Sequence, residues 1–295
     1  MLGANNLSAC LGTSIGARAL RHSQALTLAS VGVIAGTVFE GYKLSAAITS
    51  RVVSSAGQQY TLDVALASFL IMAALTYRSL PISLSQVAVG AAIGSAAAQG
   101  IAVNWKFTSL VAASWMVTPL IGLVVAIALS QITRRMARRV RRVMTLNKLY
   151  AYLTIFSGIY ASYALGANTV GLITGMVEAP VYQHFVISLG YAAATIVGMI
   201  FLSGGTTRSV AENIVGLSPS ASFSAQIGGA VTVHGFTQFG VPVSVSQAVV
   251  GGVFGAAIPR KIVVRNDRLT REIMLGWTLA PLMGAGLAFF LSVIM

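Results

Sequence analysis

The chain has 295 residues, of which 56% are hydrophobic and 8% charged, and its mean hydropathy is +0.82. Soluble globular domains carry about 25% charged residues, so the composition excludes an ordinary soluble protein and indicates a multi-pass membrane protein with roughly eight to ten spans. The 19 Lys and Arg against 6 Asp and Glu lie largely in short loops between apolar runs, which favours a role in membrane orientation over nucleic-acid binding.

Long apolar runs place the helices in chain order. They predict spans over residues 24–39, 61–77 and 107–131, and then over 148–165, 182–202, 223–239 and 272–294. Between the two groups, residues 134–142 hold six arginines in nine positions, and we expect this loop to be cytoplasmic. Two further segments, 81–97 and 242–257, are too short and too rich in Ser, Gln and Gly for lipid-facing helices. They predict broken or re-entrant helices enclosed by protein.

Three sequence blocks occur twice in the same order. Gly-Ala-Asn at 3–5 returns at 166–168, Pro-Ile-Ser-Leu-Ser-Gln at 81–86 returns as Pro-Val-Ser-Val-Ser-Gln at 242–247, and Trp-Met-Val-Thr-Pro-Leu at 115–120 returns as Trp-Thr-Leu-Ala-Pro-Leu at 277–282. The offsets are 163, 161 and 162 residues, which indicates one duplicated unit. We therefore expect a first transmembrane repeat over 1–133, a basic cytoplasmic linker over 134–147 and a second repeat over 148–295.

The charges of equivalent loops predict that the second repeat is inverted relative to the first. Residues 18–21 are basic, while their counterpart at 178–184 has no Lys or Arg; residues 260–271 hold five basic residues, while 99–106 hold one. Opposite charge bias in equivalent loops is expected of inverted-topology transporters. The predicted helix 148–165 has no counterpart before the first Gly-Ala-Asn block, so the first repeat lacks its first helix or the true start lies upstream, which we favour.

The repeated polar blocks predict an intramembrane binding site. Serine after a proline is favoured at a helix N-terminus, where free N–H groups and the helix dipole form a site for an anion. Two such termini from inverted repeats would surround one anion, and the Gly-Ala-Asn blocks add side-chain amides that bind anions or Na⁺. A lone membrane Ser more often only allows close helix packing, but duplication in register favours the site. Asp63 is interpreted as a helix cap and His234 as a packed, hydrogen-bonded side chain.

These blocks resemble the inorganic phosphate transporter (PiT) family, which includes phosphate transporters and sulfate permeases. Its hallmarks are a duplicated Gly-Ala-Asn-Asp motif and a duplicated Pro-Val-Ser-Thr-Thr-His motif, and the similarity covers essentially the whole chain. The resemblance implies an all-α integral membrane protein of inverted-repeat architecture in the cell membrane. It implies a secondary transporter of phosphate, with Na⁺ or H⁺ as coupling ion and no other cofactor. The residues that it assigns to anion binding are Asn6, Ser83, Ser85, Thr169, Ser244 and Ser246, and those assigned to anion or cation binding are Asn5, Asn168, Gln86 and Gln247, with Na⁺ at Asn5 and Asn168.

The departures from the family pattern concern substrate and coupling. Asn6 and Thr169 replace both motif aspartates, and Gln86 and Gln247 replace both histidines. A site of donors alone suits an unprotonated oxyanion such as sulfate, and it lacks the usual proton carriers. The family base rate still favours phosphate, so sulfate stays the alternative.

The sequence favours other classes of function less. An enzyme would need a metal cluster or a nucleophile–base pair, and the six acids, three histidines and single cysteine are scattered. A passive channel would need a continuous pore, whereas paired midplane blocks favour alternating access. A non-transporting paralogue would bind oxyanion without uptake. The expected partners are the anion, the bilayer and, in a homo-oligomer, a second copy of the chain.

Overall fold

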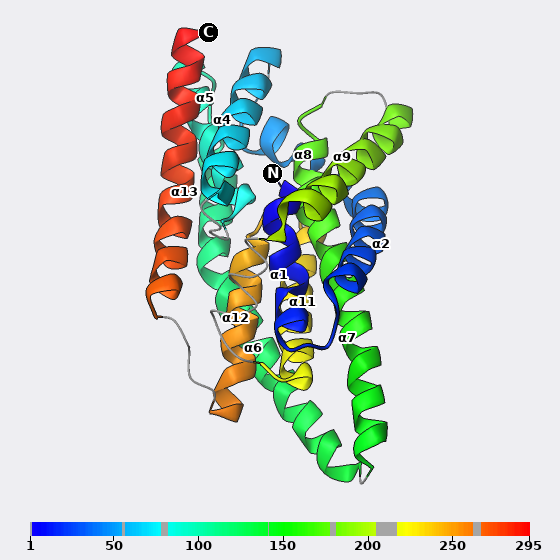
Figure 1. Cartoon of the computed structure of the whole chain (residues 1–295). Helices are drawn as coiled ribbons and strands as arrows, with labels where there is room; N and C mark the ends of the chain where they lie inside the picture. The colour runs from blue at the N-terminus through cyan, green and yellow to red at the C-terminus, as the bar shows by residue number, and fades with distance from the viewer. Residues whose placement is uncertain are drawn as a thin grey trace.

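The computed structural model describes residues 2–54, 57–77, 82–140, 142–177, 181–204, 217–261 and 267–295. Within these residues the regular structure is helical, apart from an isolated antiparallel bridge between Val53 and Val103. The protein is therefore an all-α multi-pass membrane protein, as the composition predicts. Figure 1 shows an elongated bundle whose C-terminal helix ends at the top, while the connection between α6 and α7 lies at the bottom.

The helices follow the predicted spans closely. The long ones are α2 (His22–Glu40), α4 (Gln58–Tyr77), α6 (Trp105–Arg139), α7 (Val143–Leu165), α9 (Val181–Leu202), α11 (Pro219–Gln238) and α13 (Asp267–Ile294). The predictions missed one helix, α1 (Leu2–Gly16). The shorter elements are α3 (Tyr42–Ala46), η1 (Ala47–Arg51), α5 (Leu84–Gln99), η2 (Gly166–Val170), α8 (Gly171–Thr174), α12 (Val245–Ala257) and η3 (Ile258–Arg260). Each of the seven predicted spans corresponds to one long helix.

By length and composition, five helical stretches among the described residues can cross a membrane. They are His22–Glu40, Gln58–Tyr77, Trp105–Arg139, Gln183–Leu202 and Arg271–Ile294. Helix α6 is longer than predicted, because it continues through the first arginines of the basic segment and ends at Arg139. Long basic side chains at a helix end reach water, so they do not have to end the helix.

The segments predicted as broken or re-entrant are the returning arms of two helical hairpins. α4 packs on α5, and α11 packs on α12. The two ends of the first hairpin lie together. Val53, before α4, forms a bridge with Val103, after α5, and Asn104 N donates to Val52 O at 2.8 Å. In Figure 1, α12 descends from the middle of the molecule, whereas α5 lies in its upper half.

Equivalent glycines of the two repeats make equivalent contacts across the molecule. A Cβ on Gly90 of α5 would lie 2.0 Å from the carbonyl oxygen of Pro281 in α13, and a Cβ on Gly251 of α12 would lie 2.0 Å from that of Pro119 in α6. Only glycine allows backbones to approach this closely. The hairpin of each repeat therefore packs against the long last helix of the other repeat.

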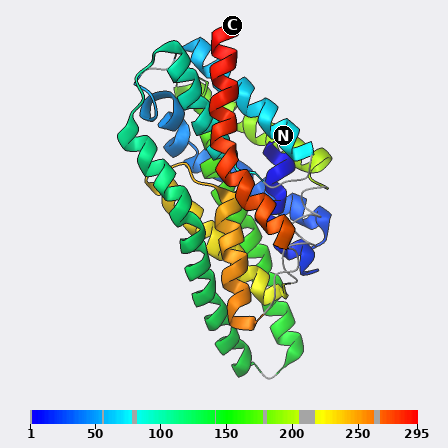
Figure 2. The same cartoon turned by 90° about the vertical axis from the view of Figure 1, so that its left-hand side faces the viewer.

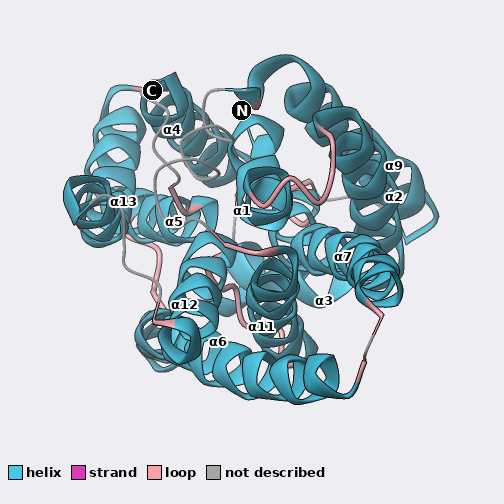
Figure 3. Ribbon diagram, turned by 60° about the horizontal axis from the view of Figure 1, so that its bottom comes forward, coloured by secondary structure: helices cyan, strands magenta, loops and turns pink. Residues whose placement is uncertain are grey.

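The first helices of the repeats show the same exchange. A Cβ on Gly3 would clash with Thr195 O of α9, and one on Gly166 with Val33 O of α2. Figures 1 and 2 show α6 and α13 running in opposite directions along the bundle. In Figure 3, α1 lies near the centre, and it contacts α7, α11 and α12.

Candidate anion site

The second Pro-x-Ser-x-Ser-Gln block forms the N-terminus of α12. Ser244 is the N-cap residue, and its Oγ accepts a hydrogen bond from Gln247 N at 3.2 Å. The hydroxyls of Ser244 and Ser246 lie 3.0 Å apart, and both residues are buried. A serine oxygen that accepts the N3 amide satisfies one of the free donors of a first helical turn, which explains why the helix starts here.

The first block forms the N-terminus of α5 in the same way. Ser83 is the N-cap residue and accepts from Gln86 N at 3.4 Å. Ser85 Oγ donates to the backbone oxygen of Val243 at 2.9 Å, so this residue joins the two blocks directly. Segments 158 residues apart in the sequence thus meet at one place, and two buried helix N-termini with their hydroxyls lie side by side.

Both glutamines that stand in the motif-histidine positions carry a buried, unsatisfied oxygen. Oε1 of Gln86 and Oε1 of Gln247 have no hydrogen-bond partner among the described residues, although the two side chains are almost fully buried. An unpaired buried polar atom costs about 1–3 kcal/mol. Both N-termini therefore carry a buried acceptor that the described part of the protein leaves unpaired.

The second Gly-Ala-Asn block lies between α7 and α8. Its residues lie in the π-helical turn η2 (Gly166–Val170), a local distortion of a kind often found at functional sites. The fully buried Asn168 donates through Nδ2 to Thr237 Oγ1 at 2.9 Å and to Val241 O at 3.4 Å. Val241 directly precedes the Pro242 block, so Asn168 is tied to the segment that leads into α12. Its Oδ1 has no partner among the described residues.

The remaining predicted residues are less informative. Asn6 is buried in α1, but its Nδ2 donates to Leu2 O of the same helix at 3.0 Å. Thr169 is buried in η2. The side chain of Asn5 lies outside the described residues, as does Pro81. The structure thus brings together Ser83, Ser85, Gln86, Ser244, Ser246 and Gln247, with Asn168 connected through Val241.

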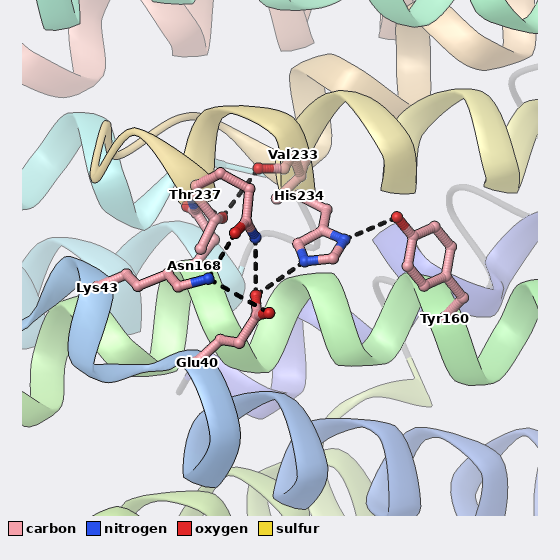
Figure 4. Close-up of polar contacts among 8 residues, drawn as sticks. Glu40, Lys43, Tyr160, Asn168, Val233, His234 and Thr237 are labelled. Atoms are coloured by element: carbon pink, nitrogen blue, oxygen red, sulfur yellow. Dashed lines mark hydrogen bonds and ion pairs between the residues drawn. The ribbon is translucent and has the colours of Figure 1, made fainter.

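A polar cluster next to Asn168 was not predicted as a unit. Figure 4 shows Glu40 and His234 pointing toward each other, with Oε2 to Nε2 at 2.8 Å, while Tyr160 contacts the other ring nitrogen at 2.8 Å. Lys43 Nζ lies 3.4 Å from Glu40 Oε1. The sequence interpretation of His234 as a packed, hydrogen-bonded side chain agrees with these contacts, and its acidic partner is Glu40, the last residue of α2. In the repeat, Leu202 occupies the position equivalent to Glu40, so the repeats alone could not reveal the cluster.

Trp115, in the first copy of the tryptophan block, contacts the second Pro-x-Ser-x-Ser-Gln block. Trp115 of α6 donates its indole N–H to the carbonyl oxygen of Pro242 at 3.2 Å. Because this proline begins the segment leading to Ser244, the tryptophan holds the approach to α12. The repeated sequence block does not by itself predict this polar contact.

Comparisons with known proteins agree on one family. The family model described as the phosphate transporter family matches residues 2–288. A protein named "Putative phosphate permease" from Methanocaldococcus jannaschii is 27% identical over 99% of this chain and 92% of its own length. A protein named "Probable low-affinity inorganic phosphate transporter" from Rhizobium meliloti is 24% identical over 68% of this chain and 63% of its own.

A solved structure shares the fold. It is named "The sodium-dependent phosphate transporter", and it matches with a TM-score of 0.82 at 20% identity over 99% of this chain and 94% of that one. The arrangement of helices described above is therefore the one found in that transporter.

Proposed function

The chain belongs to the phosphate transporter family, and from this premise we propose that it is a permease that moves inorganic phosphate across the cell membrane. The observation that supports this most is the meeting of two capped helix N-termini, α5 and α12, through Ser85 and Val243. Backbone N–H groups, hydroxyls and two positive dipole ends converge there, and these are the groups that hold phosphate at helix N-termini in proteins.

The unsatisfied oxygens of the site bear on the choice between phosphate and sulfate. Phosphate at neutral pH carries at least one O–H, which donates a hydrogen bond, whereas sulfate only accepts. Gln86, Gln247 and Asn168 each have a buried oxygen without a partner among the described residues, and these atoms accept hydrogen bonds. The proposed site thus contains hydrogen-bond acceptors as well as donors, and the acceptors favour phosphate over the alternative substrate, sulfate.

For the coupling ion, we infer that the acceptors also serve a cation. Asn168 Oδ1 and the backbone oxygens around it are ligands of the kind that Na⁺ takes, and oxygen ligands suit hard cations generally. Asn5, the equivalent residue of the first block, is assigned the same role. Thr169 and Asn6 complete the set of groups expected around the anion.

We also propose that the two repeats, 1–133 and 148–295, are inverted and work by alternating access. Reciprocal contacts support this, because each hairpin packs on the last helix of the opposite repeat. An arrangement in which each half contributes one N-terminus to a shared site fits rocking of one half against the other around a bound anion.

Uptake into liposomes tests the function. Purified protein is reconstituted, and entry of ³²P-phosphate and ³⁵S-sulfate is measured with an inward Na⁺ gradient, with an inward H⁺ gradient and with neither. We expect phosphate uptake that excess unlabelled phosphate inhibits and excess sulfate does not. Sulfate uptake that is insensitive to phosphate would contradict the phosphate assignment, and anion binding without any uptake would contradict transport.

A further inference from the structure

A second polar site lies away from the motifs, around the carboxylate of Asp63 in α4. Three helices contribute to it. Gln99 Nε2 of α5 donates to Oδ2 at 2.8 Å, Ser292 Oγ of α13 lies 2.5 Å from Oδ2, and Ser95 Oγ of α5 lies 3.4 Å from it. Gln59 Nε2 donates to Oδ1 at 3.0 Å. Asp63 is fully buried and lies in the second turn of α4, which begins at Gln58, so the sequence interpretation of it as a helix cap is wrong.

The negative charge of Asp63 has no partner of opposite sign in the described part of the chain. The ion pairs found there join Glu40 to Lys43 and to His234, and neither involves Asp63. All four groups around the carboxylate are neutral. Four hydrogen-bond donors from three helices meet the carboxylate. Buried charges in membrane proteins are normally paired, and an unpaired one indicates a functional site.

The second repeat carries a positive charge, and no carboxylate, among the equivalent residues. The residue equivalent to Gln99 is Arg260, and the residues equivalent to Gln59 and Ser292 are Ser220 and Ser130. Arg260 donates to Ser130 Oγ and, at 3.1 Å, to Ser220 Oγ. The position equivalent to Asp63 is Ser224. One repeat therefore holds a guanidinium among hydroxyls, and the other holds a carboxylate among hydroxyls and amides.

We propose that Asp63, Ser95, Ser292 and Gln99 form a binding site for one monovalent metal cation, with Na⁺ as the test ion. The bound cation lies beside Ser292, the equivalent of the Ser130 that the Arg260 guanidinium contacts in the second repeat. It is separate from the motif site, and it does not depend on which anion the protein transports.

The geometry suits a single small ion. The oxygens of Ser95 and Ser292 lie 2.9 Å apart, and both lie within 3.4 Å of Asp63 Oδ2. Three oxygens this close together can share one ion, and Gln99 supplies a fourth by turning its amide oxygen inward. One carboxylate balances one positive charge, which favours a monovalent over a divalent cation. The ion would join α4, α5 and α13. The C-terminal end of α13 lies at the top of Figure 1.

Equilibrium binding of ²²Na⁺ to purified protein, in phosphate-free buffer with choline as the balancing cation, tests the site. The variant Asp63→Asn keeps the shape of the side chain and removes its charge, and we expect it to bind one Na⁺ fewer per chain than the wild type. Ser292→Ala removes one ligand, and we expect at least about a fivefold weaker affinity for that ion. Ser224→Ala, at the equivalent position of the other repeat, serves as the matched control and should bind like the wild type.

Two outcomes would overturn the proposal. One is an unchanged Na⁺ stoichiometry in Asp63→Asn; the other is a wild-type protein that binds no ²²Na⁺. If Asp63→Asn fails to fold, unchanged affinity in Ser292→Ala decides against the site. Because no phosphate is present, loss of this site and loss of phosphate transport are observed independently.

Discussion

The serines at the start of α5 and α12 can serve the helix and the ligand at once. Ser83 and Ser244 each accept the N–H of the glutamine three residues later through one lone pair. The hydroxyl hydrogen of Ser83 can then donate to an anion, and that of Ser244 can do so when Ser246 is the donor in their mutual contact. The same residue thus starts the helix and offers a donor at its N-terminus, which explains why both copies of the motif carry serine at this position.

The acceptors of the site give a prediction about selectivity. Gln86→Leu and Gln247→Leu remove the buried amide oxygens at similar volume. Because sulfate makes no hydrogen bond to these oxygens, we expect the preference for phosphate over sulfate to fall by about 5- to 12-fold in each variant. Competition of sulfate against ³²P-phosphate uptake measures this ratio. Gln131→Leu, at an exposed position of α6, is the control, and an unchanged preference in both site variants would contradict the role of the acceptors.

At the residue scale, the sequence predicted the duplicated serines but not the surroundings of Asp63. Ser83 and Ser244 were recognisable because they follow a proline at a fixed offset. The partners of Asp63 lie 32, 36 and 229 residues away on other helices, so its place near the start of a predicted span favoured a cap. Alignment of the repeats could have suggested otherwise, since Arg260 is equivalent to Gln99.

At the scale of elements, periodicity and hydropathy predicted the long helices and missed α1. This helix contains Gly, Asn and Ser, which have low helix propensity, and its sequence resembles a loop. Tertiary packing overrides the propensity, because Gly3 allows the backbone of α1 to approach α9. The hairpin arms α5 and α12 were predicted as broken or re-entrant helices with serine at the N-terminus, but their packing on α4 and α11 could not be predicted from hydropathy.

The close approach of α5 to α13 gives a stability prediction. In Gly90→Ala, the new Cβ would meet the Pro281 carbonyl oxygen at 2.0 Å, and the two helices would have to separate. We expect a loss of about 1–3 kcal/mol, and hence a melting temperature in detergent lower by about 2–10 °C.

The matched control for this variant is Gly286→Ala in α13. A Cβ there meets no atom within 4 Å, and alanine favours a helix over glycine by about 0.5–1 kcal/mol. The control should melt at the same or a higher temperature. Equal melting of Gly90→Ala and the wild type would show that α5 and α13 do not pack as described.

At the scale of the whole molecule, the two repeats exchange partners. The hairpin of one packs on the long last helix of the other, and the tips of both hairpins meet at Ser85 and Val243. The order and offset of the sequence blocks predict a duplicated unit, and this stays a prediction. The exchange could not be predicted, because it depends on which glycines face which carbonyls in the folded bundle.

Inverted topology predicts that equivalent loops lie on opposite sides of the membrane. Gly57 and Ser218 are exposed and directly precede α4 and α11. With the buried Cys10 replaced by alanine, Gly57→Cys and Ser218→Cys should each react with an impermeant maleimide from one side only, and from opposite sides in sealed vesicles of uniform orientation. Labelling of both from the same side would show parallel repeats.

The affinity of Ser83→Ala and Ser244→Ala for phosphate tests the central claim most directly. Isothermal titration of the purified variants with phosphate is compared with Ser109→Ala, an exposed serine of α6. If both hydroxyls contact one buried anion, each variant should bind phosphate about 5- to 150-fold more weakly, while the control binds like the wild type. Affinities within about twofold of the wild type in both variants would contradict an anion site at the meeting N-termini of α5 and α12.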